Sequence, residues 1–324
     1  MKFSRRRFLQ LTAGAAALPT ITQLARAQTF PSRPVRIIVG NTAGGSTDIV
    51  ARLIGQRLSE RLGQPFIVEN RPGASGNIAA EATVRAPADG HTLLLISSTN
   101  AANVTLFENL NFDLTRDLAP VAAITRGHLV LQLNPSVPAR SVPELIAYAR
   151  AHPGKLSFAS VGSGSTPHLA GVLFAMMAGV DMIHVPYRGG GHALTDLMGG
   201  QVQLMITNLP AIEHNQAGKL RALAVTTATR SEAMPGLPAI GEFVRGYEAS
   251  VWFGISAPKH TPTEIIDTLN KTINSALTDP KIKERLTDFG GTALSLSPTE
   301  FGKLISDETE KWGKVIRAAN VRPE

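Results

Sequence analysis

Short β-branched runs alternate with longer stretches of helical period along most of this chain, and this alternation is what most constrains its fold. Residues 35–39 (VRIIV) predict a strand, and a glycine-rich turn follows them. Beyond the turn, apolar residues keep to one helical face as far as Leu62, and Gly63 marks the end of that helix. The order is typical of α/β proteins built around a mainly parallel sheet.

The same alternation recurs downstream and ends in a mainly helical last third. A helix is expected near 79–85, and further strands are expected at 66–68, 92–96, 156–159, 182–185, 202–206 and 220–226. Capping boxes begin at Ser141, Thr261 and Ser297, and Pro280 starts another helix. Because 324 residues exceed one compact core and no long linker is present, we expect two closely packed domains.

Composition excludes several classes of function. The chain has no cysteine, so disulfide frameworks, thiolate metal sites and cysteine nucleophiles are ruled out. The eight histidines never occur as His-x-His or His-x-x-x-His, and no metal site is predicted. The net charge of +7 is concentrated in residues 1–27, which leaves the rest of the chain at only +2. We therefore expect no nucleic-acid partner.

The N-terminus has the pattern of an export signal. Arg5 and Arg6 lie in a twin-arginine motif, a mildly apolar stretch covers 9–18, and Ala25-Arg26-Ala27 is a small-x-small cleavage site. A membrane anchor is the alternative, but the apolar run is shorter than the roughly 20 residues that span a bilayer. We predict export to the periplasm with cleavage after Ala27, by the twin-arginine route or the general secretory one.

Enzyme motifs are missing from the glycine-rich turns. Residues 40–47 (GNTAGGST) lack the lysine of a phosphate-binding P-loop. Residues 162–167 (GSGSTP) match neither the dinucleotide fingerprint nor Gly-x-Ser-x-Gly. We therefore predict no catalytic residues and no cofactor.

Three glycine- and hydroxyl-rich loops each leave a strand and enter a helix: the first loop (41–48), the second loop (160–168) and the third loop (187–191). Such loops expose backbone N–H groups at helix N-termini, where an anion is stabilised. Alternatively, each loop only caps its helix, through Ser46 or Thr47 in the first and Ser165 or Thr166 in the second. Only Arg188 adds a positive charge to the three, so we expect a small carboxylate rather than a phosphate.

Nine motifs occur in order along 30–322: 44–52 (GGSTDIVAR), 69–77 (ENRPGASGN), 88–94 (ADGHTLL), 185–191 (VPYRGGG), 196–202 (DLMGGQV), 234–238 (MPGLP), 252–254 (WFG), 261–262 (TP) and 311–312 (KW). Together they resemble the Bug/TctC-type receptors, the extracytoplasmic solute-binding proteins of tripartite tricarboxylate transporters. The chain departs from the family pattern at Arg188, where a lysine is common, and at Thr207-Asn208, where many relatives have an acidic residue.

The resemblance implies a type II periplasmic-binding-protein fold, in which two doubly wound α/β domains enclose a ligand cleft. Domain 1 would comprise 28–124 and 249–324, and domain 2 would comprise 125–248, with a hinge near Ile124 and Ser250. The implied ligand-binding residues are Thr42, Ala43, Gly44, Asp48, Ser160, Gly162, Ser165, Thr166, Tyr187 and Asn208. Asp48 is also expected to hold the first loop, as the acidic residue in the first turn of its helix.

The function expected from these features is capture of a small carboxylate and its delivery to a membrane transporter. The receptor would be a monomer that meets the transporter subunits transiently. A sensory receptor read by a signalling kinase would need the same cleft and is a second hypothesis. A periplasmic hydrolase is a third, with His168 as the only histidine near Ser163 and Ser165.

Overall fold

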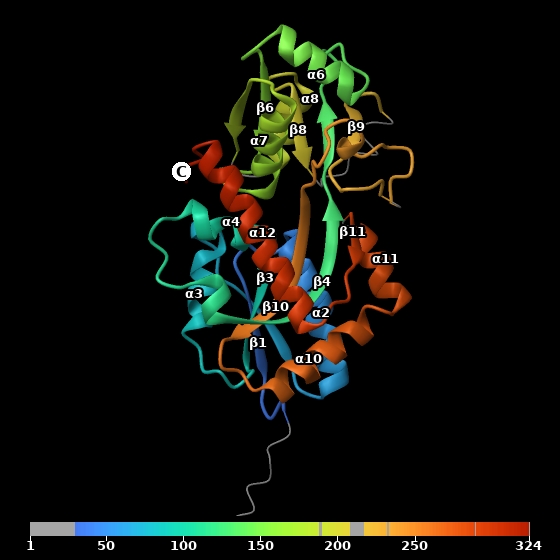
Figure 1. The fold of residues 1–324 in the computed structure, drawn as a ribbon. Helices are drawn as coiled ribbons and strands as arrows, with labels where there is room; N and C mark the ends of the chain where they lie inside the picture. The colour runs from blue at the N-terminus through green and yellow to red at the C-terminus, as the bar shows by residue number, and fades with distance from the viewer. Residues whose placement is uncertain (1–29, 188–189, 208–216, 232, 289, 324) are drawn as a thin grey trace, which may run out of the picture.

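The strands form two separate sheets, each flanked by helices (Figure 1). The computed structural model describes residues 30–187, 190–207, 217–231, 233–288 and 290–323, so the predicted signal segment lies outside the described residues. From edge to edge, the first sheet consists of β11 (Gly291–Ala293), β4 (Leu118–His128), β10 (Ser250–Pro258), β3 (Thr92–Ser97), β1 (Val35–Val39) and β2 (Phe66–Asn70). The second sheet consists of β7 (Met182–Pro186), β6 (Leu156–Ser160), β8 (Leu204–Thr207), β5 (Val130–Leu133) and β9 (Arg221–Val225).

Helices connect most of the strands. They are α2 (Ser46–Leu62), α3 (Asn77–Val84), α4 (Ser98–Leu106), α5 (Leu114–Asp117), α6 (Val142–Ala151), α7 (Thr166–Ala178), α8 (Gly190–Met198), α10 (Thr263–Ala276), α11 (Pro280–Asp288) and α12 (Pro298–Ala318), with short 3₁₀ turns η1 (Ala74–Gly76) and η2 (Ile240–Glu242). In the described part of the chain, no helix is both long and apolar enough to cross a membrane.

Both sheets are mixed, with parallel strands next to antiparallel ones. β1 pairs in parallel with β2 and β3, and β6 pairs in parallel with β7 and β8. The long strands β4 and β10 pair antiparallel, as does β5 with its neighbours. The carboxyl ends of parallel strands lie at the same edge of a sheet, so the loops that leave β1, β3 and β6 are placed where ligands bind in such folds.

The chain crosses between the sheets twice, and the two crossings are bonded to each other. It leaves the first sheet at Leu129, between β4 and β5, and returns between β9 and β10. The Leu129 N–H donates to Oγ1 of Thr226 at 2.9 Å, and the Thr226 N–H donates to the Leu129 carbonyl at 2.9 Å. Helix α12 runs beside both sheets (Figure 1): Phe301 near its start packs against Trp252, whereas Trp312 belongs to the core of the second sheet.

Several predicted elements are confirmed. The strand at 35–39 is β1, and α2 ends at Gly63, whose left-handed backbone (φ 73°) gives its N–H to the Ser59 carbonyl. The capping box at Ser297 is confirmed, because Ser297 N–H donates to Glu300 at 2.8 Å and Glu300 N–H donates back at 3.2 Å. The capping box at Thr261 is wrong: its hydroxyl donates to the Pro258 carbonyl at 2.8 Å, and no side chain caps α10.

Candidate functional site

A cleft of about 520 Å³ lies between the two sheets. One wall comes from the loop after β1, the η1 turn and the start of α4, and the other comes from the loop after β6. No charged side chain lines the cleft among the described residues. Those that line it are Gly40, Asn41, Thr42, Gly45, Ser46, Thr47, Ser75, Gly76, Leu94, Leu95, Ser97, Ser98, Thr99, Asn100, Leu129, Val161, Gly162, Ser163, Ser165, Thr166, Pro167, Gly190, Thr207, Val251 and Phe253.

The first loop enters α2 without a side-chain cap. The N-cap residue is Gly45, and no side chain bonds to the first-turn N–H groups, so the alternative that Ser46 or Thr47 caps the helix is wrong. Ser46 and Thr47 line the cleft instead. The uncapped first turn leaves backbone donors that a ligand can use.

Asp48 holds the first loop from beneath. Its Oδ2 accepts the Gly44 N–H at 3.0 Å and Nε of Arg52 at 2.9 Å, and its Oδ1 accepts Nδ2 of Asn70 at 3.0 Å. The same Asn70 amide donates to the Asn41 carbonyl at 3.0 Å. The hydrogen bond from Arg52 is the largest cause that lowers the pKa of the Asp48 carboxyl to about 2. Asp48 therefore carries a negative charge that its neighbours neutralise, and it stands outside the cleft lining.

The second loop is fixed by its own hydroxyls. Ser165 is the N-cap of α7: its Oγ accepts the His168 N–H at 3.4 Å and donates to the Gly162 carbonyl at 2.7 Å. Beneath the loop, Oγ of buried Ser160 accepts the Gly162 N–H at 3.1 Å and contacts Nε2 of His184 at 2.7 Å. Ser160 thus supports the loop from below, while Gly162 and Ser165 line the cleft.

Ser165 is not arranged as a nucleophile. Its hydroxyl donates to a carbonyl, and Nδ1 of the His168 ring accepts the Gly164 N–H at 3.0 Å. The imidazole is therefore not a base for Ser165, although a hydrolase requires such a pair.

Thr166 joins the two walls of the cleft. Its Oγ1 lies 3.0 Å from Oγ of Ser98, in a buried contact between the first residues of α7 and α4. Because the two hydroxyls come from opposite sheets, this hydrogen bond ties the second loop to the first sheet. The sequence did not indicate Ser98 as its partner.

The start of α4 is part of the site that the sequence analysis missed. Oδ1 of Asn100 accepts from the Ser97 N–H at 2.9 Å and from the Ser97 hydroxyl at 3.2 Å. Those bonds orient the amide so that its Nδ2 remains as a donor. Asn100 is only 7% exposed, and it lines the cleft. The hydroxyl-rich run 97–100 (SSTN), directly after a strand, was the available signal.

The ten ligand-binding residues that the resemblance implied do not all lie at the cleft. Four line the cleft: Thr42, Gly162, Ser165 and Thr166. Ala43, Gly44, Asp48, Ser160 and Tyr187 are not among its lining residues, and Asn208 lies outside the described residues.

The third loop is described only at its two ends. Tyr187 donates its hydroxyl to Oδ2 of Asp196 at 2.8 Å. Burial, with this bond, raises the pKa of that phenol to about 12. Gly190 lines the cleft, whereas Arg188 and Gly189 lie outside the described residues.

The N-termini of α2, α4 and α7 therefore converge on one cleft. Each carries a partial positive charge, the first turn of α2 has no side-chain cap, and Asn100 adds a side-chain donor. Such a set attracts a small anion through hydrogen bonds without a formal positive charge nearby. The two sheets, the double crossing and this polar cleft define the class of the two-lobed solute-binding proteins.

The chain belongs to the family described as the tripartite tricarboxylate transporter family receptor (TctC), whose model matches residues 50–321. It is 39% identical to protein BugT of Bordetella pertussis over 317 residues, which cover 96% of this chain and 95% of BugT.

Two solved structures of relatives contain dicarboxylates. Rpa4515 of R. palustris with adipate is 40% identical at a TM-score of 0.80, with 91% of this chain and all of that one covered. MatC from Rhodopseudomonas palustris with bound malate is 32% identical at a TM-score of 0.76, with 89% and 100% covered. The type II fold and the family expected from the sequence are confirmed.

Proposed function

We propose that this receptor captures a small carboxylate in the cleft, leaves it chemically unchanged and delivers it to a tripartite membrane transporter. The observation that carries the proposal is the convergence of three helix N-termini on a cleft whose described lining is polar and uncharged. The relatives seen with adipate and with malate support the ligand class.

In this proposal the ligand carboxylate is held by neutral donors from both walls. The first wall offers the hydroxyl of Thr42 and Nδ2 of Asn100, and the second offers the N–H and hydroxyl of Thr166, while Gly162 and Ser165 shape the loop around it. Hydrogen bonds to a charged group contribute about 1.5–3 kcal/mol each, so a few of them suffice for micromolar binding. Bridging waters complete the contacts that side chains do not reach.

Ligand capture would close the two walls about the crossings. The proposed domains are 28–124 with 249–324, and 125–248. The bonds between Leu129 and Thr226 support a hinge at this place, because they keep the two crossings together while the walls move.

A thermal-shift screen of organic acids tests the proposal. At a ligand concentration of 100 times the dissociation constant, mass action adds about 2.7 kcal/mol to stability. For a protein of this length that corresponds to a rise of a few degrees in Tm. The matched control is Thr42→Trp, which places an indole in the cleft from an exposed position. If no acid raises the Tm of either protein after any co-purified ligand is removed, the proposal is contradicted.

We also propose that the receptor is exported as a precursor, is cleaved after Ala27 and acts as a periplasmic monomer. Replacing Arg5 and Arg6 by lysine should leave uncleaved precursor in the cytoplasm if the twin-arginine route is used. Normal processing of that variant would assign export to the general secretory route.

A further inference from the structure

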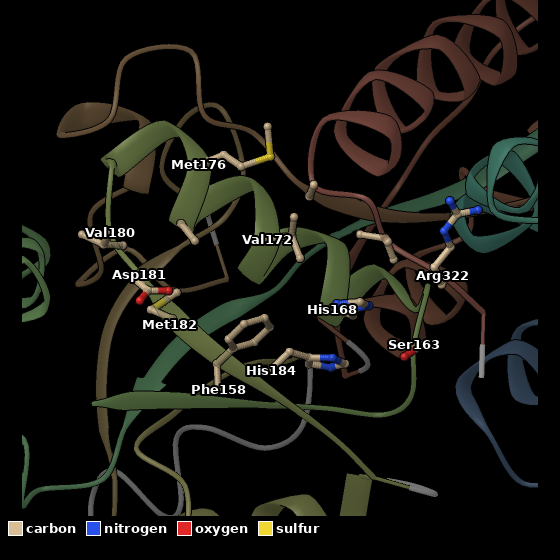
Figure 2. A pocket seen from close by; sticks show the side chains of 13 residues that line it. Phe158, Ser163, His168, Val172, Met176, Val180, Asp181, Met182, His184 and Arg322 are labelled. Atoms are coloured by element: carbon tan, nitrogen blue, oxygen red, sulfur yellow. The ribbon is translucent and has the colours of Figure 1, made fainter. Parts of the chain in front are cut away.

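A second cavity, of about 430 Å³, lies between α7, the strands β6 and β7 and the residues that follow α12 (Figure 2). Ser163 lines both this cavity and the cleft, so the second loop contributes to each. The other lining residues are Phe158, His168, Val172, Ala175, Met176, Val180, Asp181, Met182, His184, Ala319, Val321 and Arg322.

His168 gives this cavity a hydrogen-bond donor. Nδ1 accepts the Gly164 N–H, so the proton of the neutral ring is on Nε2. Burial, helped by the stacked His184 ring at 3.6 Å, lowers the pKa of His168 to about 3, which keeps the ring neutral. No hydrogen bond from Nε2 to another described residue is present, and His168 lines the cavity. A ligand oxygen would satisfy this donor.

Most of the other residues that line the cavity are apolar, although Ser163 and His184 are polar, and opposite charges lie at its two ends. Val172 and Met176 of α7 and Met182 of β7 line it, and Asp181 and Arg322 lie far apart in the view (Figure 2). The Arg322 guanidinium is paired at 2.6 Å with an exposed glutamate, Glu108, a pair that solvent screens and that another anion can replace.

We propose that this cavity is a second ligand site, for a small monocarboxylate with an apolar tail. The carboxylate accepts from Nε2 of His168 and from Arg322, and the tail lies against Val172 and Met176. A second carboxylate is disfavoured because the tail points towards Asp181, which carries the same charge.

Occupancy of this cavity is coupled to the cleft, a step that rests on the function proposed above. Ser163 of the second loop lines both the cavity and the cleft, and a ligand on Nε2 restrains the His168 ring whose Nδ1 accepts from Gly164 of the same loop. The coupling is reciprocal, so each ligand raises the affinity for the other.

Calorimetric titration with hexanoate tests the site, with hexanamide as the uncharged probe of the same shape. We expect saturable hexanoate binding, and binding of hexanamide weaker by about 10-fold or more because charge-assisted hydrogen bonds are the stronger ones. Val172→Trp fills the cavity from α7 and should abolish hexanoate binding. Arg322→Gln should weaken it by about 10-fold, and Thr42→Trp, which blocks only the cleft, should leave it intact.

Two results would overturn the second site. One is the absence of saturable hexanoate binding to the wild type. The other is binding that disappears in Thr42→Trp but persists in Val172→Trp, which would place hexanoate in the cleft. Circular dichroism verifies each fold, and Met176→Trp, at a more exposed position, repeats the block if Val172→Trp fails to fold.

The coupling has its own measurement. Saturating hexanoate should tighten binding of a cleft ligand such as adipate by about 5-fold, and an unchanged affinity would refute the coupling. Failure of adipate and other acids to bind at all would refute the proposed function, whereas the hexanoate titration would still decide the second site.

Discussion

Replacing Thr166 by valine removes one buried hydroxyl at the cleft and keeps the shape of the side chain. The hydroxyl has two possible effects on ligand binding. It pairs with Ser98 at 3.0 Å across the cleft, and a neutral pair contributes about 0.5–1.5 kcal/mol. In our proposal it also donates to the ligand carboxylate, which adds about 1.5–3 kcal/mol. Thr166→Val should therefore weaken binding by about 10- to 100-fold or more, because the hydrogen bond to the ligand carboxylate is the larger of the two contributions.

A double-mutant cycle separates the two effects. Ser98→Ala breaks only the cross-cleft pair and should weaken binding by no more than about 10-fold. The double variant should bind as weakly as Thr166→Val alone, because the Ser98 hydroxyl acts through Thr166. Calorimetric titration with the acid found by thermal shift gives the four affinities, and Tm values verify that all four proteins are folded.

The reasoning has two points of failure. Wild-type affinity in Thr166→Val would show that the hydroxyl neither touches the ligand nor holds the cleft. Equal losses in Thr166→Val and Ser98→Ala, with no further loss in the double variant, would show that the hydroxyl acts only through the cross-cleft pair.

Three further predictions concern the first wall of the cleft. Asn100→Asp replaces a buried donor by a negative charge and should weaken carboxylate binding by more than about 10-fold in calorimetry; unchanged affinity would remove this residue from the site. The folded pKa of Asp48, about 2 against an ordinary 3.8, stabilises the fold above pH 4, and the benefit disappears as the pH falls towards 2. Asp48→Asn should therefore lower the free energy of unfolding by about 2 kcal/mol at pH 7 and by little at pH 2.5, measured with denaturant. An equal loss at both pH values would show that the charge of Asp48 is not what stabilises the fold. A Cβ at Gly40 would lie 2.6 Å from Cα of Gly76, so Gly40→Ala should lower Tm and displace the loop, whereas Gly45→Ala, with 3.6 Å to its nearest atom, is the tolerated control.

Much of the local structure followed from the sequence because it depends on neighbouring residues. The β-branched run 35–39 becomes β1, and the capping pair of Ser297 and Glu300 begins α12. Local patterns failed where a competing partner lay close by in space. Thr261 has the spacing of a capping box, but its hydroxyl bonds the preceding turn.

The family, the fold class and the polar loops were determined by the sequence itself, because motif order and periodicity are properties of the chain. Only the tertiary structure decided which side chains meet. It paired Ser98 with Thr166, 68 positions apart. It also brought Asn100 to the same cleft from a helix that the sequence analysis had not predicted. The physical reason is that strand order and the double crossing, rather than sequence spacing, set the distances between the helix N-termini that form the site.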